Sequence, residues 1–73
     1  MPLVTIRIAR RATPTTAEQK AALIAGVTDV VQAVLDKGRD SVTVIIDEVD
    51  PDNWGEGGQT VTCARAARPP PPA

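Results

Sequence analysis

The chain has 73 residues, a formal net charge of −1 and 42% hydrophobic residues, which is the composition of one small folded domain. It contains no histidine and a single cysteine, Cys63, which excludes Ser-His-Asp triads, Cys-His pairs, His-ligated zinc, internal disulfides and CxxC metal sites. The balanced charge argues against nucleic acid or an anionic membrane as a partner, and without a membrane-length apolar run or a signal-peptide core we expect a soluble cytoplasmic protein.

The first predicted element is a strand over residues 3–9. Its apolar side chains alternate with other residues, and this period of two places Val4, Ile6 and Ile8 on one face. A polar connection that contains a proline follows over residues 10–16.

A helix is predicted next, and two capping boxes fit its first turn. In one the pair is Thr15 with Glu18, and in the other it is Thr16 with Gln19; the sequence does not choose between them. Apolar residues then recur at spacings of three and four, which indicates one apolar helical stripe. This stripe contains Leu23, Val27, Val30 or Val31, and Val34.

The helix is expected to end at Lys37 and Gly38, because a cation in the last turn and a glycine just after it are typical of helix C-termini. A second strand is predicted over residues 41–47. Val42, Val44 and Ile46 share one of its faces, opposite Thr43 and Ile45. Asp47 and Glu48, at the end of this strand, are interpreted as exposed charges.

The C-terminal third begins with a turn predicted over residues 50–53. The glycine-rich segment 55–58 is interpreted as the bend of a hairpin that returns through an extended segment, residues 60–63. The chain then ends in a proline-rich stretch without an apolar pattern. We therefore expect one domain over residues 2–63 and a disordered tail over residues 64–73.

The order strand, helix, strand predicts an α/β (α+β) fold, a short β-α-β subunit with parallel strands. One helix covers one face of a two-stranded sheet, whereas parallel sheets are normally covered on both faces. A chain of this length also buries only about 60% of its unfolded surface when it folds alone. We therefore expect oligomerisation to complete the fold.

Several motifs resemble the 4-oxalocrotonate tautomerase family, the short-subunit members of the tautomerase superfamily that use an amino-terminal proline. The resemblance runs from Pro2 to about Val61, and it lies in the order of the motifs. These are Pro2 at the start of a strand, Glu18-Gln19-Lys20 at the start of a helix, Ser41-Val42-Thr43-Val44-Ile45-Ile46 in the second strand, and Trp54-Gly55 followed by Gly57-Gly58.

The resemblance implies that Pro2 is the catalytic acid/base. Removal of Met1 leaves a secondary amine, and an apolar pocket with nearby arginines is expected to lower its pKa toward neutrality, where proton transfer is most efficient. The resemblance also implies that Arg10 or Arg11 binds the substrate carboxylate, since a guanidinium can bond both carboxylate oxygens. Trp54 takes the place of the family's aromatic residue, which keeps the pocket apolar.

Two features depart from the pattern of these tautomerases. The family has an arginine in the second strand that stabilises charge on the substrate's carbonyl oxygen, and Thr43 takes its place here. Thr43, or Arg39 from a neighbouring subunit, is the candidate for this role. In addition, Trp54-Gly55-Glu56 resembles an arrangement in one subunit of trans-3-chloroacrylate dehalogenase, which also lacks the strand arginine and whose glutamate activates water. Glu56 is therefore a candidate for water activation.

The resemblance implies a tautomerase that needs no cofactor or metal and acts on an unsaturated keto or enol carboxylic acid, with a role in the catabolism of aromatic compounds. Two alternatives stay open: a 3-haloacrylate dehalogenase or hydratase that uses Glu56, and a non-catalytic oligomeric binding module. The expected partners are a small-molecule carboxylate substrate and further subunits. These subunits form a homo-oligomer, a hexamer by resemblance, or a hetero-oligomer with a similar chain; no nucleic acid or membrane partner is expected.

Overall fold

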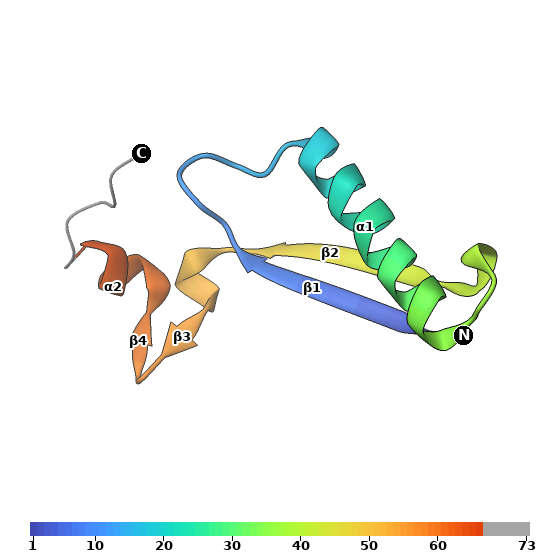
Figure 1. Ribbon diagram of the computed structural model, residues 1–73. Coiled ribbons are helices and arrows are strands. Elements are labelled where there is room, and N and C mark those ends of the chain that lie inside the picture. Colours follow the sequence, from blue (N-terminus) through green and yellow to red (C-terminus); the bar gives the residue numbers. More distant parts are fainter. Residues whose placement is uncertain (67–73) are drawn as a thin grey trace.

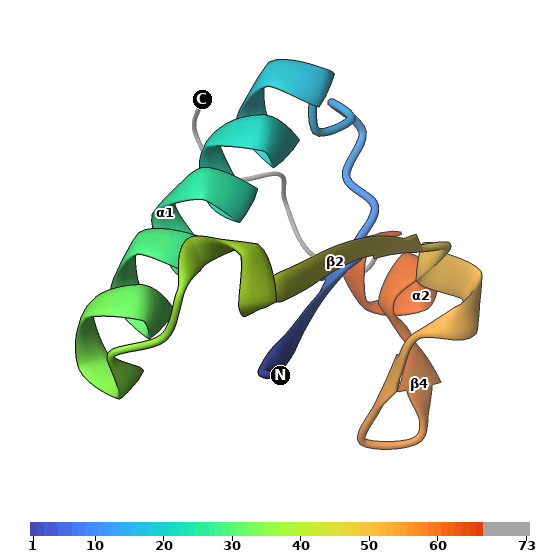
Figure 2. The same cartoon turned by 90° about the vertical axis from the view of Figure 1, so that its right-hand side faces the viewer.

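The computed structural model describes residues 1–66. A long helix, α1, crosses one side of two long strands, and a small hairpin with a short helix lies at the end of these strands that is far from the N-terminus (Figure 1, Figure 2). The helices and strands are β1 (Leu3–Ala9), α1 (Ala17–Leu35), β2 (Thr43–Val49), β3 (Gly55–Glu56), β4 (Gln59–Thr60) and α2 (Val61–Ala66). Neither α1 nor α2, the helices of this range, is long and apolar enough to cross a membrane.

β1 and β2 pair in parallel and α1 connects them, so the predicted β-α-β subunit is confirmed. The register places Leu3 opposite Thr43 at one end of the pair and Ala9 opposite Val49 at the other. Exposed and half-buried residues alternate along both strands until their last residue. The alternation that predicted the strands is therefore the alternation that assigns one face to α1.

β2 begins two residues later than predicted and extends further. Residues 39–41 form a 3-10 turn, η1 (Arg39–Ser41), in which the Ser41 N–H donates to the Gly38 carbonyl at 3.0 Å. This turn occupies the start of the segment that was predicted as strand. At its other end the strand continues through Glu48 to Val49.

The start of α1 shows which of the two capping boxes forms. Thr16 is the N-cap, and its hydroxyl accepts a hydrogen bond from the Gln19 N–H at 3.1 Å. In return, the Gln19 side-chain oxygen accepts one from the Thr16 N–H at 3.0 Å. Because both donors are satisfied reciprocally, the pair fixes where the helix begins.

The end of α1 differs from the prediction. The helix stops at Leu35, and the left-handed residue that follows is Asp36, with φ 52° and ψ 48°. Gly38 has extended backbone, φ −63° and ψ 142°, and Lys37 lies outside the last turn of the helix. Aspartate adopts the left-handed region more readily than most residues because its short polar side chain forms local hydrogen bonds. The helix therefore ends without a glycine.

The described part of the subunit has almost no interior. Thr28, at 7% exposure, is its only buried residue, and no apolar side chain in residues 1–66 is buried. Val27 and Val31 are half-buried. Val30 and Val34 are 62% and 74% exposed. In this subunit Val31 therefore faces inward, whereas Val30 and Val34 of the predicted apolar stripe occupy exposed positions.

The face of the sheet opposite α1 is open to solvent. Leu3 is 62% exposed on this face, and Ile45 on the neighbouring strand is 48% exposed. Burial of apolar surface is the main favourable term in folding, and this subunit obtains little of it alone. Self-association stays the prediction for how the fold is completed.

The segment after β2 agrees with the prediction at first and then departs from it. The predicted turn forms as η2 (Pro51–Asn53), and the glycine-rich bend forms between β3 and β4. Gly57 and Gly58 have φ 60° and 84°, a left-handed pair that suits a tight hairpin and that glycine adopts most readily. The hairpin returns through β4, and residues 61–66 then form helix α2, so the predicted return over residues 60–63 is correct only at Thr60 and the predicted start of the tail falls inside a helix. Residues 67–73 of that tail lie outside the described residues.

Contacts with other elements hold α2, whose first residues are β-branched and favour a helix weakly. The Thr62 hydroxyl donates to the Asp52 carboxylate in η2. The Arg65 guanidinium donates to the Arg10 carbonyl at 2.7 Å. α2 thereby ties the turn after β2 to the connection that leads from β1 to α1.

Candidate active site

The candidate residues gather at the two ends of the β1–β2 pair. At the N-terminal end Pro2 is half-buried, and its carbonyl accepts a hydrogen bond from the Thr43 N–H at 3.0 Å. Because the strands are parallel, the start of β2 lies beside the start of β1. Met1, which precedes Pro2, is 98% exposed. The structure therefore brings Pro2 and Thr43 together.

The two candidate arginines follow the other end of β1. The Arg10 N–H donates to the Val49 carbonyl at 2.8 Å and so extends the pairing beyond the strands. A parallel strand rises about 3.3 Å per residue, which puts Arg10 about 26 Å from Pro2. This separation exceeds the length of a small substrate. One subunit by itself does not unite the proline and the arginines.

Arg10 is occupied by contacts within its own subunit. Its Nη2 lies 2.9 Å from Asp50 Oδ2, and its carbonyl accepts the hydrogen bond from Arg65. The pKa of Asp50 lies below its ordinary value, mainly because the Asp52 N–H donates to this carboxylate, with a further contribution from Arg10. Arg10 therefore links the end of β2 to the start of the connection between β1 and α1.

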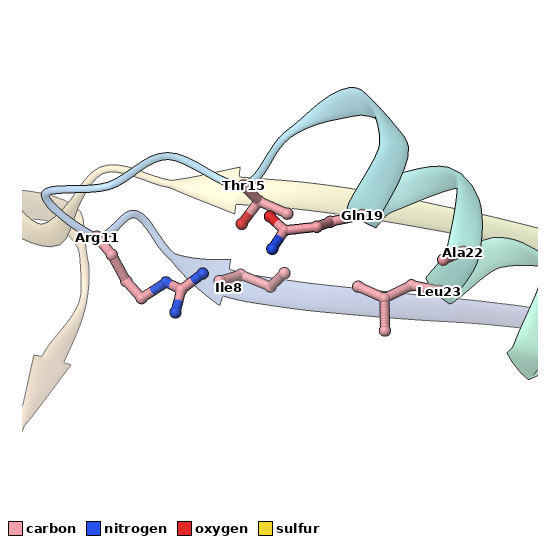
Figure 3. A pocket seen from close by; sticks show the side chains of 6 residues that line it. All are labelled: Ile8, Arg11, Thr15, Gln19, Ala22 and Leu23. Carbon is pink, nitrogen blue, oxygen red and sulfur yellow. The ribbon is translucent and has the colours of Figure 1, made fainter. Parts of the chain in front are cut away.

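Arg11 instead lines a groove of about 620 Å³ beside the first turns of α1. Figure 3 shows its guanidinium pointing toward this groove and toward Ile8. Within residues 1–66 no carboxylate forms an ion pair with Arg11. Between the two arginines that the sequence leaves open, the geometry favours Arg11 for an anionic ligand. The groove is lined by Ile8, Arg11, Thr15, Gln19, Ala22 and Leu23.

A pair of charges that sequence reasoning missed joins the first turn of α1 to the end of β2. Lys20 on α1 forms an ion pair with Glu48 at the end of β2, and the side chain of Glu48 is only 16% exposed. The pKa of Glu48 is lowered, mainly by the hydrogen bond and the positive charge of Lys20. The interpretation of Glu48 as an exposed charge is therefore wrong. Its position in the alternation, two residues after the inward Ile46, is the signal that could have shown this.

Trp54 and Glu56 follow β2 and so lie at the arginine end of the strands (Figure 1). Trp54 is half-buried, and its carbonyl accepts a hydrogen bond from the Val61 N–H at 2.8 Å where the hairpin closes. Glu56 is exposed in β3, and in the described range its carboxylate has no cationic partner. Neither residue approaches Pro2 within one subunit.

Arg39, the second candidate for stabilising an oxyanion, is held against α1. Its Nη1 donates to the Asp29 carboxylate and, at 3.3 Å, to the Gln32 side-chain oxygen. The ion pair with Asp29 is exposed to solvent. In this subunit Arg39 is therefore bound to the helix, whereas Thr43 is beside Pro2.

Comparison with known proteins identifies the family of this chain. Residues 2–64 match the family model described as tautomerase enzyme. The chain belongs to the tautomerase family. The matched range includes both ends of the β1–β2 pair, with Pro2 at one and Arg11 at the other. Among curated relatives, the protein named "Probable tautomerase K2" from Dickeya dadantii (strain 3937) is 53% identical over 62 residues, which are 85% of this chain and 90% of that protein.

Solved structures agree with this assignment. DmpI from Helicobacter pylori superposes on this tautomerase with a TM-score of 0.82 and 43% identity, over 89% of this chain and 97% of that one. A heterohexamer 4-oxalocrotonate tautomerase from Chloroflexus aurantiacus J-10-fl gives a TM-score of 0.74 and 31% identity, over 85% of this chain and 95% of that one. The resemblance to the 4-oxalocrotonate tautomerase family is confirmed. The protein is an isomerase-type enzyme, so the alternative of a non-catalytic binding module is set aside.

Proposed function

We propose that this tautomerase isomerises an unsaturated keto or enol carboxylic acid in a site that two subunits share. Pro2 of one subunit supplies the acid/base, and Arg11 of a neighbouring subunit binds the substrate carboxylate. The observation that carries the proposal is the separation of about 26 Å between Pro2, just before β1, and the arginines that follow β1, because each end of the strand has one half of the required chemistry. A neighbouring subunit that brings its own Pro2 to the groove of Arg11 supplies the missing half.

The proposed reaction begins with the Pro2 amine, which becomes free when Met1 is removed. The amine takes the proton of the enol hydroxyl, and the electron pair of that O–H bond forms the carbonyl. The carbon–carbon double bond shifts along the chain, and the prolyl ammonium returns the proton to the distal carbon. Atoms and electrons balance without a metal, a cofactor or a second substrate.

Three further residues have roles in this proposal. Thr43 lies at the proline end, and its hydroxyl donates a hydrogen bond to the oxygen on which negative charge develops. Arg11 and Trp54 come from the neighbouring subunit, where Arg11 binds the carboxylate and Trp54 keeps the pocket apolar. Arg39 receives no role, because its guanidinium is bound by Asp29 and Gln32.

The proposed assembly is a homo-oligomer, with a hexamer as the preferred form. Its support is the apolar surface that the subunit leaves open on both the sheet and the helix. The most exposed of these side chains are Leu3, Val30, Val34, Leu35 and Ile45. The Chloroflexus aurantiacus relative is described as a heterohexamer. For this chain a hetero-oligomer with a similar subunit is the alternative, and native mass spectrometry of the protein expressed alone distinguishes the two.

A second candidate reaction rests on Glu56. Its carboxylate is exposed, has no cationic partner in residues 1–66, and lies at the same end of the strands as Arg11. A carboxylate in that state can accept a proton from water. It would then direct hydroxide to a 3-haloacrylate bound at Arg11, while Pro2 of the neighbour protonates the adjacent carbon and halide leaves. This gives the dehalogenase or hydratase alternative.

The experiment that tests the proposal compares two preparations of the protein, one with Met1 removed and one that retains it, as established by mass spectrometry. Both are assayed with a 2-hydroxy-2,4-dienoate and with trans-3-chloroacrylate. We expect turnover of the dienoate by the processed protein alone, because an amide nitrogen has no basic lone pair. Full turnover by protein that retains Met1 contradicts the mechanism. Turnover of chloroacrylate that Glu56→Gln abolishes supports the alternative reaction.

A further inference from the structure

The capping box at the start of α1 leaves one polar group directed at the groove of Arg11. A glutamine amide has an oxygen that accepts hydrogen bonds and an NH₂ group with two donors. In Gln19 the oxygen is occupied, because it accepts the hydrogen bond from the Thr16 N–H at 3.0 Å. The orientation of the amide is thereby fixed, since the reverse orientation would place the NH₂ group against another donor.

The fixed amide has its NH₂ group on the groove side. Figure 3 shows the Gln19 nitrogen on the side of Ile8, in the space toward which Arg11 also points. Gln19 and Arg11 line the same groove. Among residues 1–66 the Gln19 NH₂ group donates to no protein acceptor. Both of its donors are therefore available to a ligand.

The rest of the groove suits an anion with an apolar body. Ile8, Ala22 and Leu23 supply its apolar wall, and none of its lining residues is acidic. Arg11 is its only cation. The other arginines of the strands and of η1 have carboxylate partners in residues 1–66: Arg7 with Asp47, Arg10 with Asp50, and Arg39 with Asp29. The charge balance of the groove fits one carboxylate rather than two.

We propose that Gln19 binds the substrate carboxylate together with Arg11, and that the groove selects a substrate with a single carboxylate on an apolar chain. The assignment of Arg11 as the carboxylate-binding group rests on the proposed function; the role of Gln19 goes beyond it. The residue has two functions, because its oxygen caps the helix while its nitrogen faces the ligand. A glutamate at this position would cap equally well but would place negative charge in the groove.

This difference gives a variant that separates binding from folding. Gln19→Glu preserves the capping box, because glutamate and glutamine serve it alike. The second carboxylate oxygen then faces the groove, where it repels the substrate carboxylate and competes for Arg11. We expect KM for phenylenolpyruvate to rise roughly 10- to 100-fold, the loss of a hydrogen bond to a charged group, with kcat unchanged. KM for the methyl ester of phenylenolpyruvate, which has no carboxylate, should not rise.

Gln32→Glu is the matched control, because it makes the same change on the same helix outside the groove. The Gln32 oxygen accepts a hydrogen bond from Arg39, and a carboxylate accepts it equally well. This variant should keep the parent KM for both substrates. An unchanged KM for phenylenolpyruvate in Gln19→Glu overturns the proposal, and so does an equal rise in Gln32→Glu.

A binding measurement distinguishes failure of this inference from failure of the proposed reaction. Phenylacetate, which has no enol and cannot react, is titrated into the oligomeric protein while the side-chain NH₂ signals of Gln19 and Gln32 are followed by NMR. We expect the chemical shifts of the Gln19 NH₂ group to change until phenylacetate saturates the site. Those of the Gln32 NH₂ group should stay unchanged. That result without any tautomerase turnover supports the inference and contradicts the proposed function. Tautomerase turnover together with unchanged Gln19 chemical shifts contradicts the role of Gln19 but not the proposed function.

Discussion

The two ends of the β1–β2 pair are built in opposite ways. At the arginine end, Arg10, Asp50 and Arg65 are linked by hydrogen bonds, and Lys20 pairs with Glu48. At the proline end the described contact of Pro2 is a backbone hydrogen bond from Thr43. The arginine end, which is the binding end in the proposed function, is fixed within one chain. The proline end, which is the reactive end, is open.

This difference indicates what each end requires of the assembly. A site that holds a carboxylate needs a guanidinium in a fixed position, and local ion pairs supply that. A proline that serves as a base near neutral pH needs an apolar and positively charged surrounding, which lowers the pKa of an amine. The chain of Pro2 supplies little of this surrounding, so it has to come from a neighbour.

The largest expected effect concerns the reactive end. Pro2→Ala, in protein whose Met1 has been removed, places a primary amine where the secondary amine was. We expect activity to fall about 10²- to 10⁴-fold, the usual contribution of a positioned acid–base group. In the parent enzyme, kcat/KM should rise with pH as the prolyl ammonium loses its proton. Parental activity in Pro2→Ala would contradict the role of Pro2 as the acid/base.

The binding end gives the next effect, and the two adjacent arginines serve as a matched pair. Arg11→Ala should raise KM for the carboxylate substrate roughly 10- to 100-fold with a smaller effect on kcat, because a carboxylate clamp acts in the ground and transition states alike. Arg10→Ala should instead lower the midpoint of thermal unfolding and leave KM near the parent value, because Arg10 contacts Asp50 and α2. If the two variants exchange these phenotypes, Arg10 is the binding residue.

Part of this structure could be predicted from the sequence. The two strands follow from short-range patterns and were predicted, β2 with a start two residues too early, whereas the capping box was left open between two pairs. The burial of Glu48 could have been derived, since it lies in the same alternation as Val44 and Ile46. The helix α2 could not, because contacts such as that between Arg65 and Arg10 override its weak local propensity.

For the site, the residue types were predictable, and so was part of their grouping. Residues near both ends of one parallel strand are necessarily far apart, so Pro2 and Arg11 could have been assigned to different subunits from the sequence alone. The choice between Arg10 and Arg11 required the structure, because it depends on which guanidinium Asp50 binds. Likewise, the attachment of Arg39 to Asp29 depends on the angle at which η1 meets α1.

The smallest effect concerns the ion pair between Lys20 and Glu48. The pKa of Glu48 is below its ordinary value of 4.5 in the folded protein. A lowered carboxylate pKa stabilises the fold above the unfolded pKa, and this stabilisation is lost as the pH falls through the folded pKa. Glu48→Gln should therefore flatten the decline of unfolding free energy in acid, measured by urea denaturation below pH 5. Asp47→Asn, which changes the exposed neighbour, should keep the parental decline; equal flattening in both variants would contradict the role of Glu48.

Mixed oligomers test directly whether each active site takes its proline and its arginine from different subunits. Pro2→Ala and Arg11→Ala chains with different tags are co-expressed, and the mixed oligomers are purified through both tags. In such particles some sites combine an intact Pro2 with an intact Arg11 from the other chain. The value of kcat/KM should return to about a quarter of the parent value for random mixing of equal amounts, well above that of either variant alone. Mixed oligomers no more active than the average of the two variants would place the whole site within one subunit and contradict the account.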